Sequence, residues 1–116
     1  MQRTFRLTRS QDFKRVRQSG KSYAHPLVVL VAQANAEMKV RVGIAAGRTV
    51  GSAVKRNRAK RLLREALRPL IPSLVSGWDL ILIARPALVS SSSTDARRAL
   101  LSILRRAQLI SDPDAA

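Results

Sequence analysis

The stretch Val54-Lys55-Arg56-Asn57-Arg58-Ala59-Lys60-Arg61-Leu62-Leu63-Arg64-Glu65-Ala66-Leu67-Arg68 places seven cations and one acid in fifteen residues. On a helix with about 100° between successive residues, its apolar and basic side chains separate onto opposite sides. The apolar side holds Ala59, Leu62, Leu63, Ala66 and Leu67, and the basic side holds Asn57, Lys60, Arg61, Arg64 and Arg68. The pattern therefore predicts one helix that packs on a core and presents cations to a partner.

The start of this predicted helix adds to its positive charge. Lys55 and Arg56 fall nearer the apolar side by angle, but a helix end can project beyond its core, so we expect them to flank the basic side. Gly51 supplies a turn, and Ser52 supplies an N-cap hydroxyl. The unpaired amides of the first turn add a positive partial charge, which favours an anionic ligand.

The charge on this helix has one sign, which an ordinary solvated surface does not need. Cations three or four residues apart repel each other, so a surface that serves solubility alone would intersperse carboxylates, and only Glu65 does so. Arginine also outnumbers lysine, and its guanidinium can bind phosphate oxygens with two hydrogen bonds. We therefore interpret the helix as a nucleic-acid-binding element.

The composition predicts one folded RNA-binding domain over residues 1–116. Hydrophobic residues make up 46% of the chain, which is enough for a core, and the net charge of +15 favours salt-sensitive binding to polyanions. We expect residues 1–7 to be a basic, mobile N-terminus and residues 109–116 to be a frayed tail. Since no apolar run reaches about 18 residues and no targeting or lipidation signal is present, we expect a cytoplasmic protein with no membrane partner.

The sequence offers few groups for catalysis or metal binding. It has no cysteine and a single histidine, His25, which argues against zinc sites and thiol chemistry. No two of its seven carboxylates have a spacing that suggests an acid–base pair or a two-metal site. They are Asp12, Glu37, Glu65, Asp79, Asp95, Asp112 and Asp114. Catalysis by these side chains alone is not expected.

Outside the basic helix, residue spacing predicts an α/β sandwich of the α+β kind, in the order α-β-β-α-β-α, with an additional strand possible at 20–25. The expected elements are a helix at 10–18, capped by Thr8 or Ser10, strands at 27–32, 39–45 and 78–84, the basic helix at 53–70, and a helix at 95–108 capped by Thr94. We expect the strands at 27–32 and 39–45 to pair as a hairpin. Because the basic helix is flanked by strands, a helix-turn-helix is disfavoured and DNA is not the expected partner.

Around Arg56-Asn57-Arg58, from Gly51 to Glu65, the chain closely resembles the signature of the bacterial ribonuclease P protein subunit. The similarity extends over about residues 5 to 108, through Asp12-Phe13, Arg41-Val42-Gly43 and the segment from Trp78 to Arg85. It implies three helices around a four-stranded sheet, with a left-handed crossover from strand through basic helix to strand, against the usual rule.

The resemblance also implies a function: the small subunit of a ribonucleoprotein that removes the 5′ leader of precursor tRNA. Its partners would be ribonuclease P RNA and precursor tRNA. The active site would lie in the RNA, and Mg²⁺ would be held mainly by RNA phosphates. From the residues alone, a ribosomal protein or RNA chaperone without an attached enzyme remains the alternative.

The resemblance assigns roles to individual residues. Those expected to bind the catalytic RNA are Arg48, Lys55, Arg56, Asn57, Arg58, Lys60, Arg61, Arg64 and Arg68. Those expected in a cleft for the leader, between the first helix and the sheet, are Arg9, Phe13, Arg17, Val31, Arg41 and Arg85. Arg17 and Val31 stand where the family has aromatic residues, so we expect this cleft to bind leaders more through charge than through base stacking. Phe13 also fits a core position under the first helix, and both roles are compatible.

Overall fold

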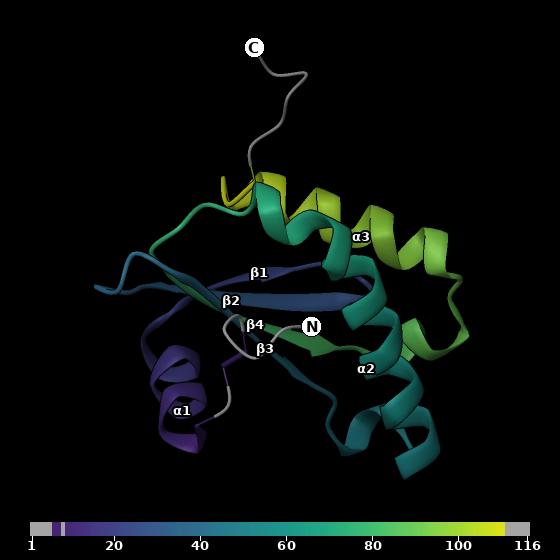
Figure 1. Ribbon diagram of the computed structural model, residues 1–116. Coiled ribbons are helices and arrows are strands. Elements are labelled where there is room, and N and C mark those ends of the chain that lie inside the picture. Colours follow the sequence, from purple (N-terminus) through teal and green to yellow (C-terminus); the bar gives the residue numbers. More distant parts are fainter. Residues whose placement is uncertain (1–5, 8, 111–116) are drawn as a thin grey trace.

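A four-stranded sheet lies at the centre of the protein, with one helix on one face and two helices on the other (Figure 1). The computed structural model describes residues 6–7 and 9–110. The main elements are α1 (Ser10–Ser19), β1 (Lys21–Ala24), β2 (Val28–Ala34), β3 (Val40–Ala45), α2 (Ala53–Leu67), β4 (Trp78–Ala84) and α3 (Ser93–Arg106). Short 3₁₀ turns are η2 (Arg48–Val50), η3 (Arg68–Ser73) and η4 (Pro86–Ser90). The predicted α+β sandwich is confirmed, including the additional strand, which is β1.

The strand order is β1-β2-β4-β3, so the predicted hairpin between β2 and β3 is wrong. β2 is antiparallel to both β1 and β4, whereas β3 is parallel to β4. β4 is apolar on both faces, since Leu80 and Leu82 alternate with Ile81 and Ile83, and such a strand is favoured in the middle of a sheet. The parallel pair β3–β4 needs a crossover, which α2 supplies. The left-handed sense of this crossover stays a prediction.

The helix ends follow local side-chain chemistry. The predicted cap of α2 is confirmed, because the Ser52 hydroxyl accepts from the Lys55 amide at 3.4 Å. α2 ends at Leu67, earlier than expected, because Pro69 follows as the second residue of the η3 turn. α3 is capped by Ser92, which accepts from the Asp95 amide at 3.0 Å, so the predicted cap at Thr94 is wrong.

Of the two caps predicted for α1, Ser10 is wrong and Thr8 is untested. Its N-cap position is Arg9, which makes no capping bond, and Ser10 lies inside the helix. The other predicted cap, Thr8, lies outside the described residues. Gly20 ends the helix as expected, and its amide donates to the Val16 carbonyl at 2.7 Å.

Two hydrophobic clusters hold the layers together. The larger one joins α2 and α3 to one sheet face, and the smaller one joins α1 to the other face. The smaller cluster consists of Leu7, Val16, Val31 and Ile81, with Phe13, Val29 and Ile83 packed against it.

Both ends of the described chain include a buried leucine. Leu7 is 3% exposed, and its amide donates to the Val42 carbonyl at 2.9 Å. Leu109 is 2% exposed, and its amide donates to Leu104 at 2.9 Å. Leu7 packs in the smaller hydrophobic cluster and Leu109 in the larger one. The remaining predictions for the termini, over 1–5 and 111–116, lie outside the described residues.

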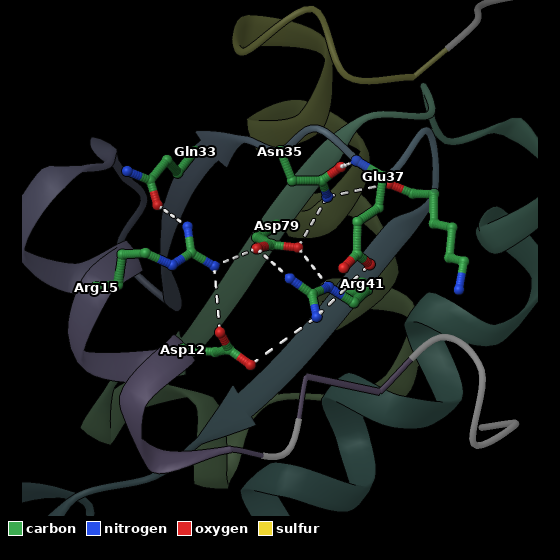
Figure 2. A network of polar contacts seen from close by, with 8 residues as sticks. Asp12, Arg15, Gln33, Asn35, Glu37, Arg41 and Asp79 are labelled. Carbon is green, nitrogen blue, oxygen red and sulfur yellow. Dashed lines mark hydrogen bonds and ion pairs between the residues drawn. The ribbon is translucent and has the colours of Figure 1, made fainter.

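Asp79, a buried carboxylate in β4, fixes α1 on the sheet (Figure 2). Its two oxygens accept hydrogen bonds from Nε and Nη2 of Arg41, both at 2.8 Å. Nη2 of Arg15, on α1, donates to it at 2.5 Å, and Nδ2 of Asn35 donates at 2.9 Å. One carboxylate therefore joins β4, β3, α1 and the loop after β2.

A second ring of polar groups surrounds this centre (Figure 2). Arg15 also donates to Gln33 and lies 3.5 Å from Asp12. Nη1 of Arg41 lies 3.9 Å from both Asp12 and Glu37. Two arginines are therefore shared among three carboxylates.

The network sets the ionisation of Asp79. Burial alone would raise the pKa of its carboxyl, but the hydrogen bonds from Arg41, Arg15 and Asn35 outweigh burial and hold the pKa below the usual range of aspartate. The hydrogen bond to Asp79 in turn raises the pKa of both arginines. An acid whose pKa is lower in the folded than in the unfolded state stabilises the fold above its unfolded pKa, and this contribution is lost as the pH falls through the folded pKa.

We expect Asp79→Asn to lower the free energy of unfolding at pH 7 by about 3 kcal/mol, because two guanidiniums would then face a neutral amide. Urea unfolding measures this loss. The gap between the wild type and the variant should narrow as the pH falls below about 4, the ordinary pKa of an unfolded aspartate, and should close as the pH falls through the lower pKa of the folded Asp79 carboxyl.

Asp12→Asn is the matched control. Asp12 is partly exposed and lies 3.5 and 3.9 Å from its arginine partners, so its loss should cost less than about 1 kcal/mol. Equal losses in the two variants, or a gap that does not change with pH, would contradict the role given to Asp79.

Candidate nucleic-acid interface

The basic side of α2 is open to solvent, as the sequence predicted. Asn57, Arg61, Arg64 and Arg68 are exposed and Lys60 is half-buried. On the opposite side, Ala59, Leu63, Ala66 and Leu67 are buried and Leu62 is half-buried. We call Asn57, Lys60, Arg61, Arg64 and Arg68 the basic face.

The cations around the start of α2 differ in their surroundings. Arg48, in η2, and Lys55 are exposed. Arg56 is half-buried, and its Nε is buried without a hydrogen-bond partner among the described residues. Nε of Arg58 donates to the Val89 carbonyl of η4 at 2.9 Å, so this arginine leans away from the basic face toward the η4 turn.

A groove at the outer side of β3 brings α2 and α1 together. It is lined by cations from the N-terminal segment and from α2, with an aromatic ring and β3 between them. Its lining residues are Arg6, Leu7, Phe13, Val42, Gly43, Ile44, Lys60 and Arg64. We call it the Phe13 groove. Three cations around one aromatic ring suit a nucleotide, because the cations can bind its phosphate and the ring can stack on its base.

Gly43 makes room for the ring of Phe13. A Cβ atom at position 43 would lie 2.3 Å from Cζ of Phe13, so the ring rests directly on the β3 backbone. Phe13 is half-buried and packs against the cluster of Val16 and Val31. The core role is therefore confirmed, and the exposed part of the ring is left for a ligand.

Arg17 lies on the other side of Phe13. Phe13 also borders a shallow, open depression on α1, together with Ser10, Lys14, Arg17 and Gln18. Arg17 and Lys14 are exposed. The depression therefore has two cations at the position where the resemblance implies a second aromatic residue in the family.

Two residues predicted to lie in the leader cleft take part in the protein's own packing and ion pairs instead. Val31 is 4% exposed and packs in the core beneath α1, so it is not accessible to RNA. Arg41 directs its guanidinium nitrogens at Asp79, Asp12 and Glu37, so its charge is already matched by carboxylates.

The other two, Arg9 and Arg85, are exposed. Arg9 is at the start of α1, and Arg85 follows β4, where its Nη1 lies 3.4 Å from the His25 carbonyl. Both stay predictions as leader contacts.

Sequence reasoning missed Arg6 as a groove residue and Asp79 as the organiser of α1. Arg6 was recognised as basic, but its place came from a β-bridge to Val42 that no local pattern predicts. Asp79 did carry a signal, because a charged residue in an otherwise apolar buried strand requires a cationic partner.

Two kinds of site were also sought in the part of the chain that the structure describes. No group of three or more histidine, cysteine or acidic residues is placed to hold a metal ion. None of the described helices has the length and apolar character needed to cross a membrane.

Comparison with known proteins gives one family. The family described as Ribonuclease P matches residues 1–108. A ribonuclease P protein component of Herpetosiphon aurantiacus is 42% identical over 113 residues, covering 97% of this chain and 91% of its own length. One of Dehalococcoides mccartyi is 40% identical over 111 residues, covering 96% and 91%.

Solved structures have the same fold. The RNase P protein of Staphylococcus aureus superposes with a TM-score of 0.81 at 27% identity, covering 92% of this chain and 98% of that one. The RNase P protein of Thermotoga maritima gives a TM-score of 0.78 at 30% identity, covering 87% and 96%.

We expect Gly43→Ala to displace the Phe13 ring, because the new methyl carbon would lie 2.3 Å from its Cζ. The clash should lower the free energy of unfolding by about 1–3 kcal/mol, measured by urea unfolding. Gly47→Ala is the control, since a Cβ there meets nothing within 4 Å and its φ of −86° suits alanine. It should be neutral or slightly stabilising. Equal stability of the two variants would show that Phe13 does not rest on Gly43.

Proposed function

Because the chain belongs to the family of bacterial ribonuclease P protein components, we propose that it binds ribonuclease P RNA through α2 and the precursor tRNA leader beside α1. In this way it assists endonucleolytic removal of the leader, which gives the mature 5′ end of the tRNA. The observation that carries the proposal is the Phe13 groove. It places the aromatic residue assigned to the leader next to Lys60 and Arg64, which were assigned to the catalytic RNA.

The basic face is suited to a folded RNA. Its exposed guanidiniums can each bind phosphate oxygens in a bidentate manner, and Lys60 adds a point charge at the groove. The capped N-terminus of α2 adds free amides near Arg48 and Lys55. RNA held here would lie within reach of a leader in the groove.

The α1 side is suited to a single strand whose sequence varies. Phe13 offers a partly exposed ring, and base stacking tolerates any base. Arg17 and Lys14 add charge for the backbone. With Val31 buried, one ring and several cations remain, so we propose that charge dominates leader binding here.

We further propose that hydrolysis is carried out by the RNA and that Mg²⁺ is held mainly by RNA phosphates. The described acids near α1 support this, because Asp12, Glu37 and Asp79 all face arginines. The one histidine, His25, accepts the Leu27 amide at Nδ1, 3.1 Å away. The cytoplasm, where precursor tRNA is processed, is the compartment that this function implies. The alternative of a ribosomal protein or RNA chaperone is not favoured, because the family comparison selects ribonuclease P.

Reconstitution tests the proposal. Adding the protein to ribonuclease P RNA at low Mg²⁺ should stimulate cleavage of precursor tRNA at the leader junction, because the bound cations lower the repulsion between the two RNAs. Cleavage rates with and without protein measure the effect. Absence of stimulation would contradict the proposed function, and cleavage by the protein without the RNA would contradict catalysis by RNA.

Arg17→Phe tests the leader site. Replacing a cation by a stacking ring should make leader binding less salt-dependent, lowering the slope of log K against log salt by about 0.7, the value for one single-strand phosphate contact. Titration of a leader oligonucleotide at several salt concentrations measures the slope. Affinity for ribonuclease P RNA serves as the internal control and should not change. An unchanged slope for the leader would remove Arg17 from the site.

A further inference from the structure

The outward surface of α3 carries two arginines that neither the fold nor the proposed function explains. α3 holds Arg97, Arg98, Arg105 and Arg106. Arg105 and Arg106 lie in the last turn, where the helix macrodipole favours cations, and Nη1 of Arg106 donates to the Ala24 carbonyl at 2.7 Å. Arg97 and Arg98 lie well before that turn.

Arg97 and Arg98 have no partner that would give them a structural role. Both are exposed, and within residues 6–7 and 9–110 neither makes a hydrogen bond or an ion pair. The nearby Asp95 uses its amide in the Ser92 cap, and no ion pair joins its carboxylate to either arginine. Without an acid paired to either side chain, the two arginines contribute no ion pair that would stabilise the helix.

Arg98 points away from the sheet, as Arg61 and Arg68 of the basic face do. α2 and α3 lie side by side on one face of the sheet (Figure 1). Arg98 is opposite the buried side of α3, with Arg97 beside it, just as Arg61 and Arg68 are opposite the buried side of α2. Packed helices are about 8–10 Å apart, so one ligand can touch both.

The charge of the layer formed by α2 and α3 favours an anionic ligand. α2 and α3 together contain ten cations and two acids, Glu65 and Asp95. Three of the other described acids are held in the network around Asp79. An anionic membrane is less suitable than RNA, because a helix that binds membranes inserts its apolar side, and that side of α3 is buried in the core.

We propose that Arg97 and Arg98 extend the RNA-binding surface from α2 onto α3, so that both helices bind the phosphate backbone of one folded RNA. RNA duplexes are recognised mainly through backbone shape and phosphates, and cations on two neighbouring helices suit such a backbone. Phe13 and Arg17 of the proposed leader site lie on α1, on the opposite face of the sheet, and Lys60 and Arg64 of α2 border both sites. The inference rests on the proposed function, since ribonuclease P RNA is the folded RNA concerned.

The double variant Arg97→Ala/Arg98→Ala tests the proposal. Its binding to ribonuclease P RNA should be weaker, and the slope of log K against log salt should fall by about one to two, at about 0.9 for each lost duplex phosphate contact. Arg98→Lys should retain most of the slope, because lysine keeps the positive charge and loses only the bidentate hydrogen bonding of the guanidinium. Circular dichroism should show that the double variant is folded, as expected for two exposed side chains.

Lys39→Ala is the matched control, because Lys39 is exposed in the loop before β3, away from both helices, and contributes its backbone carbonyl to the fold. It should leave the slope unchanged. A double variant with the same salt slope as Lys39→Ala would overturn the inference. So would a double variant that binds ribonuclease P RNA normally but binds phosphatidylserine vesicles less well than the wild type. If the wild type itself fails to bind ribonuclease P RNA, the proposed function fails instead.

Discussion

The buried carboxylate of Asp79 is the interaction on which the arrangement of this protein depends. It lies in β4, the strand between β2 and β3, and it is reached by one arginine from β3 and one from α1. A carboxylate without water is costly unless it is paired and hydrogen-bonded, so the two guanidiniums are required wherever Asp79 is buried. This requirement fixes α1 across the sheet, and α1 carries Phe13 and Arg17. The position of the proposed leader site therefore follows from the ionisation of one buried acid.

The same network also concentrates negative charge in one place. Asp12, Glu37 and Asp79 gather around Arg15 and Arg41, at the end of the sheet where β3 and β4 begin. α2 and α3 hold ten cations against two acids, so the helix layer carries much of the net charge of +15. An RNA that approaches this layer meets a field of one sign, which speeds association and makes binding sensitive to salt.

Local patterns in the sequence predicted most of the elements, because each depends on neighbouring residues. The structure confirms three of these predictions: the opposite apolar and basic sides of α2, the cap at Ser52 and the apolar strand β4. The strand order did not, because β2 and β3 were paired by proximity in sequence, whereas the central place of β4 depends on burial of both its faces. The cap of α3 was misplaced by two residues, since Ser92 and Thr94 both carry a hydroxyl that can cap a helix.

The sequence predicted those site residues that follow a helical pattern, but not those brought together by contacts between distant segments. Lys60 and Arg64 came from helix spacing, but their meeting with Arg6 depends on a β-bridge between distant segments. Arg41 was assigned to the leader cleft from the resemblance, while its carboxylate partners come from three other segments. Val31 was also assigned to the leader cleft from the resemblance, and the structure shows that it is buried in the core.

The central claim is that two surfaces of one small protein hold two different RNAs, and site-directed cleavage tests it most directly. The chain has no cysteine, so a single introduced one carries a hydroxyl-radical probe at a unique site. In the complex of protein, ribonuclease P RNA and precursor tRNA, a probe at Arg61→Cys should cleave the ribonuclease P RNA, and a probe at Ser10→Cys should cleave the leader. Cleavage of the same RNA by both probes, or of neither RNA by the probe at position 61, would contradict the account.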